Sequence, residues 1–297
     1  GGASFGPSTL VLRLPNASLS VRVPAGDSLI YMSPSAAAVD LPRRTLHVTV
    51  LTTSDHSEYS VAVAYTTATN WPPKKNELPV FSSGVLSQAL PAGTSPKTGA
   101  APRNLLVLTN GRLIFPWFYP NGLNYSGADL FNATAVYCDK CGSGPASSMA
   151  GDFYRSATQL TIPVRAPCES CDGAIEPTIA ELPNGTLWML IRSQTGSLWQ
   201  SHSLDHGTHW STATPTNFIS SDSPPSLTQL PGGNILLLYN NALKAFPSPN
   251  RSDYPSRQIL HAALCTCTQD ECTFSGFREV WRDKLLHTAA AEHDYGT

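Results

Sequence analysis

The chain contains 297 residues, which is enough for one large all-β domain or for two ordinary domains. Only 13% of the residues are charged and the formal net charge is −2, so the sequence offers no basic patch for nucleic-acid phosphates. No apolar run approaches the roughly 18 residues of a membrane helix, and the first residues lack the charged and apolar regions of a signal peptide. We therefore expect a soluble, already processed chain with no transmembrane segment and no nucleic-acid partner.

Proline and glycine divide the chain into short segments. The 25 Pro and 21 Gly residues, together with many Ser, Thr and Asn, are typical of short strands joined by turns. Four segments repeat one pattern, which consists of a proline, an apolar strand, a turn and a second apolar strand. In chain order these segments start at Pro34, Pro102, Pro177 and Pro225. In the third and fourth, Pro-Asn-Gly at 183–185 and Pro-Gly-Gly at 231–233 supply the turn of a β-hairpin.

The spacing of the repeats predicts an architecture. Successive prolines lie between 48 and 75 residues apart, which leaves room for about four strands and insertions in each unit. Repeated four-stranded units are typical of a β-propeller, because stacking them around an axis buries both faces of each sheet. We expect a single all-β propeller domain over residues 1–297, with blade units at roughly 25–85, 98–166, 174–218 and 222–286. A β-sandwich with ordinary hairpins is the alternative.

Two pairs of cysteines allow two interpretations. Cys138-x-x-Cys141 and Cys168-x-x-Cys171 have the pairing of a four-thiolate zinc site. We favour disulfides, because residues 152–164 between the pairs are predicted to form a strand rather than a zinc knuckle. A secreted chain would also oxidise these thiols.

The remaining cysteines and the glycosylation signals indicate the compartment. Cys265, Cys267 and Cys272 form a compact loop in which one local bridge is expected, and a total of seven cysteines leaves one thiol unpaired. The sequence contains five Asn-x-Ser/Thr triplets, at Asn16, Asn124, Asn132, Asn184 and Asn250. Triplets and cysteines together favour a secreted, extracellular or lumenal protein.

One short motif lies between the third and fourth units. The string Ser203-x-Asp205-x-Gly207-x-x-Trp210 is an Asp-box. We expect a tight hairpin between the outer strands of a blade, in which Asp205 accepts turn amides and Gly207 takes a left-handed conformation. Trp210 is expected to fold back as an apolar plug. The motif is therefore structural and indicates a fold rather than a reaction.

With this motif, the segment from Glu176-Pro-Thr to Arg192-Ser-Gln-Thr-Gly-Ser-Leu and the later Ser-Pro-Pro-Ser-Leu resemble the sialidase (neuraminidase) superfamily of Asp-box, or BNR-repeat, propellers. The resemblance is strongest over residues 174–297, and before them only the hairpin pattern persists. It implies a six-bladed propeller whose active site lies at one end of the central axis. The chain would then hold about four blades and the start of a fifth, ending at Thr297.

The resemblance implies roles for four residues. Glu176 matches the family's glutamate that pairs with a nucleophilic tyrosine, and Arg192 matches an arginine that binds the substrate carboxylate. Arg257 matches a second such arginine, and Tyr295 matches the nucleophile. A neutral tyrosine suits this chemistry, because an anionic nucleophile would be repelled by the carboxylate of the sugar. Each residue also has an ordinary structural interpretation, as a strand or surface residue.

The first unit departs from the family pattern. The family's first arginine would stand at Met32, in the string Tyr-Met-Ser-Pro, so a carboxylate clamp would lose one member. The acid/base aspartate would be Asp55, for which the adjacent His56 is an alternative.

The predicted function is that of an exo-glycosidase. We expect hydrolysis of terminal sialic acid or a related acidic sugar from a glycoconjugate, with retention through a tyrosyl intermediate. This chemistry requires no metal and no organic cofactor. The alternatives are a glycosidase of the same fold that acts on a different sugar, and a catalytically decayed glycan-binding propeller, for which Met32 is the evidence.

Overall fold

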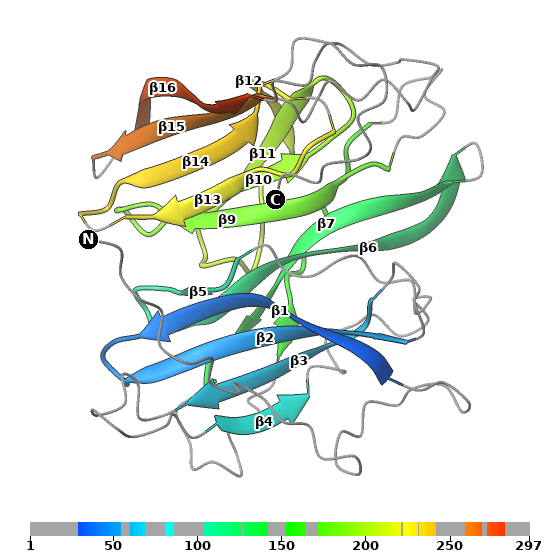
Figure 1. Ribbon diagram of the computed structural model, residues 1–297, viewed down its shortest axis with the longest axis vertical. Coiled ribbons are helices and arrows are strands. Elements are labelled where there is room, and N and C mark those ends of the chain that lie inside the picture. The colour runs from blue at the N-terminus through cyan, green and yellow to red at the C-terminus, as the bar shows by residue number, and fades with distance from the viewer. Residues whose placement is uncertain are drawn as a thin grey trace.

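The structure is a computed structural model, and it is all-β over the residues that it describes. These are residues 29–54, 60–68, 81–85, 104–125, 128–141, 153–163, 172–220, 222–230, 232–241, 259–268 and 272–282. The described strands form four antiparallel sheets of four strands each, and in every sheet the strands pair in chain order (Figure 1). The all-β class predicted from the sequence is confirmed.

Each sheet is named here as a blade. The first contains β1 (Leu29–Asp40), β2 (Thr45–Ser54), β3 (Ser60–Ala68) and β4 (Phe81–Val85). The second contains β5 (Leu106–Val107), β6 (Leu113–Tyr125), β7 (Ala128–Cys138) and β8 (Tyr154–Arg155). The third contains β9 (Ile175–Glu181), β10 (Leu187–Arg192), β11 (Ser197–Ser203) and β12 (Thr214–Ile219). The fourth contains β13 (Ser226–Gln229), β14 (Ile235–Asn240), β15 (Ile259–Cys267) and β16 (Cys272–Arg282).

The position of a strand in its blade explains its composition. Strand β10 reads Leu-Trp-Met-Leu-Ile-Arg and is buried along nearly its whole length, because both of its faces pack against a neighbouring blade. Strand β12, at the outer edge, reads Thr-Pro-Thr-Asn-Phe-Ile and alternates between exposed and half-buried residues. In the third blade, burial thus decreases from β9 and β10 to β12.

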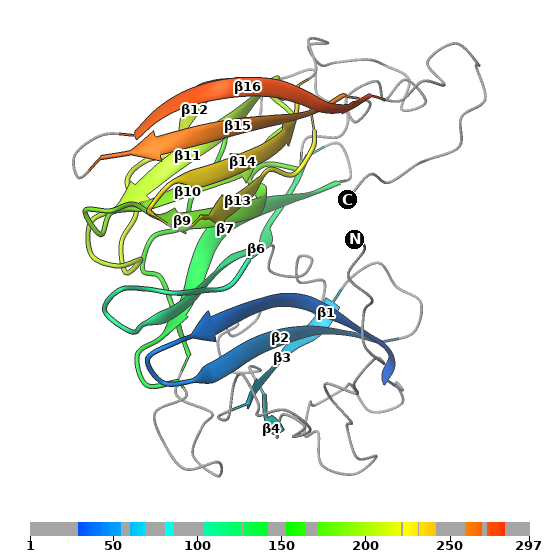
Figure 2. The same cartoon turned by 60° about the vertical axis from the view of Figure 1, so that its left-hand side comes forward.

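Each contact between neighbouring blades includes the first strand of at least one of them. Strand β1 contacts β5, β6 contacts β9, and β9 contacts β13. In both ribbon views the fourth strands β4 and β16 lie at opposite margins of the molecule, and the second and third blades lie between them (Figures 1 and 2). The first strands are therefore the inner strands, and the ends of these strands are where side chains from several blades converge.

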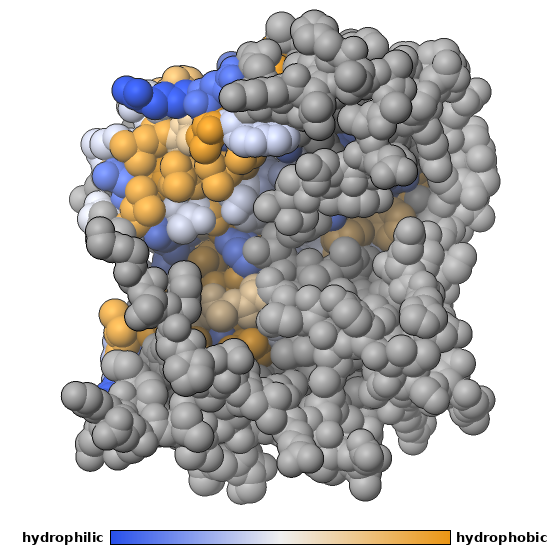
Figure 3. Space-filling model, viewed as in Figure 1, coloured by the Kyte–Doolittle hydropathy of each residue, from blue (hydrophilic) through white to orange (hydrophobic). Residues whose placement is uncertain are grey.

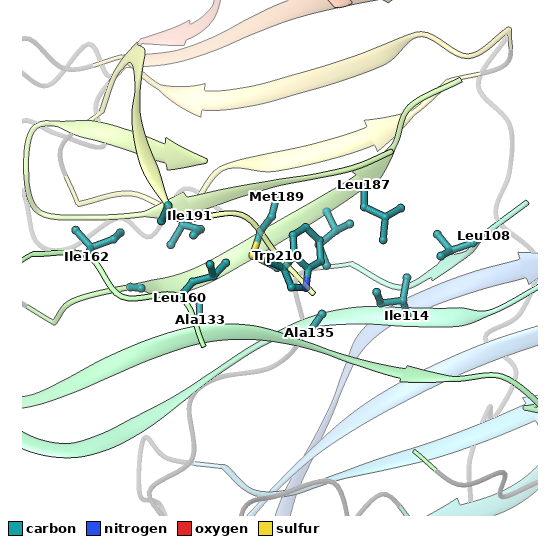
Figure 4. Close-up of a cluster of buried hydrophobic side chains, with 13 residues drawn as sticks. Leu108, Ile114, Ala133, Ala135, Leu160, Ile162, Leu187, Met189, Ile191 and Trp210 are labelled. Carbon is teal, nitrogen blue, oxygen red and sulfur yellow. The ribbon is translucent and has the colours of Figure 1, made fainter. Parts of the chain in front are cut away.

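Apolar side chains fill the seams between blades. The seam between the second and third blades includes Ile114, Ala133, Leu187, Met189 and Trp210 (Figure 4). A second cluster joins the third and fourth blades and a third cluster joins the first and second. On the fourth blade, the face turned away from the third carries further apolar side chains that are half-buried, and these form the orange area over β13 to β15 in Figure 3.

Hydrogen bonds fasten the inner strand β9 to both neighbouring blades. The side chain of Asn104 donates to the carbonyl oxygen of Ile179 at 2.5 Å and accepts its N–H at 3.2 Å. The buried carboxylate of Glu181 accepts the N–H of Thr109 at 2.9 Å and its hydroxyl at 2.7 Å. On the other side, Gln229 donates to the Glu181 carbonyl at 2.7 Å. Strand β9 is therefore held from both sides.

The Asp-box residues form the turn between β11 and β12. The Ser203 hydroxyl accepts the N–H of Gly207 at 2.8 Å and donates to Asp205 at 2.9 Å. Asp205 accepts the N–H of His209 at 2.8 Å. Trp210 is 6% exposed in the seam with the second blade, where its Nε1 donates to the Ser156 hydroxyl at 3.2 Å. The motif thus joins two blades as well as closing a turn.

The Gly207→Ala variant is expected to lose about 2–5 kcal/mol of unfolding free energy. Gly207 has a φ of +90°, and an added Cβ would overlap the Cδ1 atom of Ile114. Gly196 is a matched control, because its φ is +91° and an added Cβ would meet nothing within 4 Å. Gly196→Ala should lose only about 1–2 kcal/mol, which is the cost of the left-handed backbone alone. Equal losses in urea unfolding would show that the contact with Ile114 is unimportant.

Two disulfides are present among the described residues, Cys138–Cys141 and Cys267–Cys272, and Cys265 is a buried free thiol. The disulfide interpretation therefore holds for Cys138 and Cys141. Cys168 and Cys171 lie outside the described residues. No helix in the described ranges is long and apolar enough to span a bilayer.

Two of the glycosylation triplets differ in access. Asn184 lies exposed in the turn between β9 and β10. Asn132 is only 5% exposed in β7, where its side chain donates to Gln159 at 3.3 Å. A glycan needs an accessible asparagine, so in the folded protein Asn184 can carry one and Asn132 cannot.

His47 makes the stability of the first blade depend on pH. Burial lowers its pKa from 6.5 to about 4, although the Asp40 carboxylate opposes this shift. Between pH 6.5 and 4 the unfolded chain binds a proton that the folded chain does not, so stability falls as the pH falls through this window. We expect a loss of about 3 kcal/mol, measured as unfolding free energy against pH. The loss should be absent in His47→Gln, and an unchanged pH profile in that variant would contradict the assignment.

Candidate functional site

Three charged side chains meet where the third blade adjoins the fourth. Glu176 stands at the start of the inner strand β9, and Arg192 ends β10 beside it. Asp222 lies in the connection that leads to β13, the inner strand of the next blade. The three side chains are only 10%, 12% and 4% exposed, respectively. They form a buried charged cluster at one end of the inner strands.

The Arg192 guanidinium joins both carboxylates. Its Nε and Nη2 atoms donate to Oδ1 of Asp222 at 2.9 and 2.6 Å, and its Nη1 atom donates to Oε2 of Glu176. These bonds use three of the five N–H groups of the guanidinium. One N–H on Nη1 and one on Nη2 have no partner among the residues that the structure describes.

Both acidic residues have a left-handed backbone. The φ angle is +45° at Glu176 and +53° at Asp222. This conformation costs a residue other than glycine about 1–3 kcal/mol, and it is retained mainly where a site requires it. At Glu176 it coincides with a register shift between β9 and β10, which re-aims the side chain at this point of the sheet. At Asp222 the backbone N–H donates to the carbonyl of Ser193 at 3.2 Å.

The charges in the cluster stabilise one another. Burial alone would lower the pKa of Arg192, but the charges and hydrogen bonds of Glu176 and Asp222 outweigh burial and raise that pKa above its ordinary value. Arg192 is therefore always protonated. Two carboxylates and one guanidinium leave the cluster with one net negative charge when both acids are ionised.

The residues after Arg192 form a supporting layer. The Ser193 hydroxyl donates to the Ser197 carbonyl at 2.7 Å. The Gln194 side chain accepts the N–H of Asp172 at 2.9 Å and donates to its carboxylate at 3.1 Å. These contacts fix the turn between β10 and β11, and they restrict the positions that Arg192 can adopt.

The other predicted catalytic and substrate-binding residues lie outside the described part of the chain. They are Asp55, its alternative His56, Arg257 and Tyr295. Met32 lies in β1, where its backbone pairs with Thr52 of β2.

Asp222 was not predicted as a site residue. A signal for it exists, because Asp222 shortly precedes Pro224 and Pro225 at the start of the fourth unit, as Glu176 directly precedes Pro177 at the start of the third. An acidic residue before the opening proline is thus a feature of both units. Comparing units with each other in this way would have identified it.

The described residues contain one group of potential metal ligands, Cys265, Cys267 and Cys272, whose sulfur atoms lie within 4.8 Å of one another. Two of these sulfur atoms form a disulfide, so they are not thiolate ligands in this structure. In the charged cluster, the guanidinium of Arg192 occupies the position between the two carboxylates.

Four-stranded blades joined through inner strands, with an Asp-box in an outer turn, define a propeller of the sialidase type. The family model for the BNR repeat-like domain matches residues 87–282, and the chain belongs to this family. No curated protein sequence matches the chain.

Solved structures share the fold. A Trypanosoma rangeli sialidase in complex with 2,3-difluorosialic acid is 15% identical, with a TM-score of 0.53 over 84% of this chain and 38% of that one. An exo-beta-1,3-galactanase from Clostridium thermocellum is 11% identical, with a TM-score of 0.52 over 82% and 47% of the two chains. The NanB sialidase of Streptococcus pneumoniae, in a mutant form, is 16% identical, with a TM-score of 0.45 over 78% and 33%. The chain thus spans less than half the length of these proteins.

Proposed function

We propose that the chain provides the core of a sialidase-like exo-glycoside hydrolase that removes terminal sialic acid or a related acidic sugar. The observation that carries the proposal is the buried cluster of Glu176, Arg192 and Asp222 at the ends of the inner strands. Buried, interacting charges on a strained backbone are typical of catalytic sites. The two disulfides and the exposed Asn184 support a secreted or lumenal location.

The proposed reaction has two steps. In the first, Glu176 accepts the phenolic proton of Tyr295 while the phenolate oxygen attacks the anomeric carbon. The bond to the leaving group breaks, and Asp55 donates a proton to the departing oxygen. In the second, Asp55 removes a proton from water, which displaces the tyrosine with overall retention of configuration. Glu176 then returns its proton to Tyr295.

Arg192 is proposed to hold the carboxylate of the sugar. The Nε and Nη2 atoms donate to Asp222, which orients the guanidinium, and Nη1 donates to Glu176. One N–H on each terminal nitrogen then remains for an incoming ligand. In this proposal Asp222 is a positioning residue, and Arg257 supplies a second cation.

A neutral sugar is the second candidate substrate, and the net charge of the cluster favours it. Two carboxylates exceed the single guanidinium, so a substrate carboxylate would meet a negative field unless Arg257 balances it. A negative cluster would also stabilise the positive charge that develops on the sugar ring in the transition state. The galactanase among the proteins of similar fold acts, by its name, on a galactan.

A substrate comparison tests these proposals. Purified protein would be assayed with fluorogenic α-sialosides and, in parallel, with fluorogenic β-galactosides. Turnover of the sialoside that is lost in Tyr295→Phe supports the proposal, whereas turnover of the galactoside alone favours the second candidate. If neither substrate is turned over but sialosides bind reversibly, the chain is a glycan-binding propeller, as Met32 in place of an arginine would suggest.

A further inference from the structure

A pocket of about 420 Å³ opens between the third and fourth blades. Its lining combines five aromatic rings with polar but uncharged groups and one proline. The lining residues are Trp188, Gln200, Pro215, Thr216, Asn217, Phe218, Tyr239, Phe274 and Phe277.

The pocket follows from the geometry of the fold. Blades that pack closely at their inner strands diverge outward, so the space between the outer strands β12 and β16 needs large side chains to fill it. Phe218 of β12 supplies one, with ring centroids 4.9 Å from Phe274 and 5.4 Å from Tyr239. Phe277 of β16 stays 52% exposed at the rim. Trp188 and Tyr239 belong to the buried cluster between the two blades and Phe218 and Phe274 pack against it, so these rings form the floor of the pocket and Phe277 its accessible edge.

Two amide side chains supply the polar contacts. Gln200 accepts the indole N–H of Trp188 at 3.0 Å, so its amide nitrogen still offers two N–H groups with no partner among the described residues. Asn217 is exposed on β12 and offers a second amide. Each amide is therefore available to a ligand in the pocket.

We infer that this pocket binds a neutral sugar ring. Sugars present an apolar C–H face that packs on aromatic rings and hydroxyl groups that pair with amides, and the pocket offers both. Among the residues that the structure describes, no charged side chain lines the pocket, so this lining offers no cation to a carboxylate or a phosphate. Trp188 and Arg192 are four residues apart on β10, or about 13 Å along the strand, so this sugar site is separate from the charged cluster. A second site of this kind would increase avidity for branched glycans.

Binding of lactose to the purified protein tests the inference, with the dissociation constant measured by ligand-observed NMR. Phe277→Ala and Asn217→Ala should each weaken binding by about 2- to 10-fold. Val280→Ala and Thr214→Ala are matched controls, because these residues are exposed on the same two strands and do not line the pocket. Both controls should bind lactose as the wild type does.

Glu176→Gln separates this site from the charged cluster. Lactose binding should be unchanged in that variant, whether or not the protein hydrolyses any glycoside. Absence of saturable lactose binding by the wild type would overturn the inference. So would equal weakening by the pocket and control variants, or loss of binding in Glu176→Gln.

Discussion

Glu176→Gln is expected to lower kcat/KM for the preferred glycoside by about 10²- to 10⁴-fold, the range that a positioned general base contributes. The amide is nearly isosteric and can still accept a hydrogen bond from Arg192, but it cannot accept the proton of a nucleophile. The fall should therefore appear in kcat, and the unfolding midpoint should change little in comparison. The measurement is steady-state turnover, with thermal unfolding recorded on the same samples.

Glu181→Gln is the matched control for that experiment. Glu181 is also a buried carboxylate of β9, but it lies at the other end of the strand and bonds to Thr109 of the second blade. This variant is expected to lose stability with little change in kcat. If both variants lost activity equally, Glu176 would act only through the integrity of β9, and its proposed role as a base would be wrong.

Arg192→Met is expected to lose about 3–5 kcal/mol of unfolding free energy at neutral pH. The substitution keeps the length of the side chain but removes the guanidinium that pairs with the buried carboxylates of Glu176 and Asp222. Loss of this cation favours the protonated form of buried carboxylates, so their folded-state pKa values would rise. The loss should therefore shrink as the pH falls. Urea unfolding at two pH values measures both effects.

A triple variant, Arg192→Met with Glu176→Gln and Asp222→Asn, identifies the cause of that loss. It removes all three charges, so much of the lost stability should return even though catalysis does not. If the triple variant were as unstable as Arg192→Met, the loss would come from packing of the arginine rather than from unpaired charge.

Local patterns predicted the blades well. Hairpins depend on turn residues that are adjacent in sequence, and the turn at 183–185 lies between β9 and β10 as expected. The Asp-box is also local, because its hydrogen bonds join residues no more than four apart. The seam that receives Trp210 required the structure, since Ser156 is 54 residues away along the chain.

The sequence pointed to two of the three residues in the charged cluster. Glu176 and Arg192 were identified as site residues because a resemblance marked them, and the structure brings them into contact. Asp222 is 30 residues from Arg192, and its role depends on the packing of two blades. The left-handed backbone at both acids was not predictable either, because Glu and Asp adopt a positive φ much less often than glycine does. The aromatic pocket likewise depends on how two blades diverge.

The fastening of β9 has a consequence for how the protein moves. Side chains of the second and fourth blades bind the backbone of this strand, so it can leave its place only if two seams open together. Amide protons of β9 should thus be among the slowest to exchange with solvent, while those of the edge strands β12 and β16 exchange through local opening. Glu176 would therefore keep its orientation while the edge strands open locally. A ligand would reach the inner strands through motion of the edge strands alone.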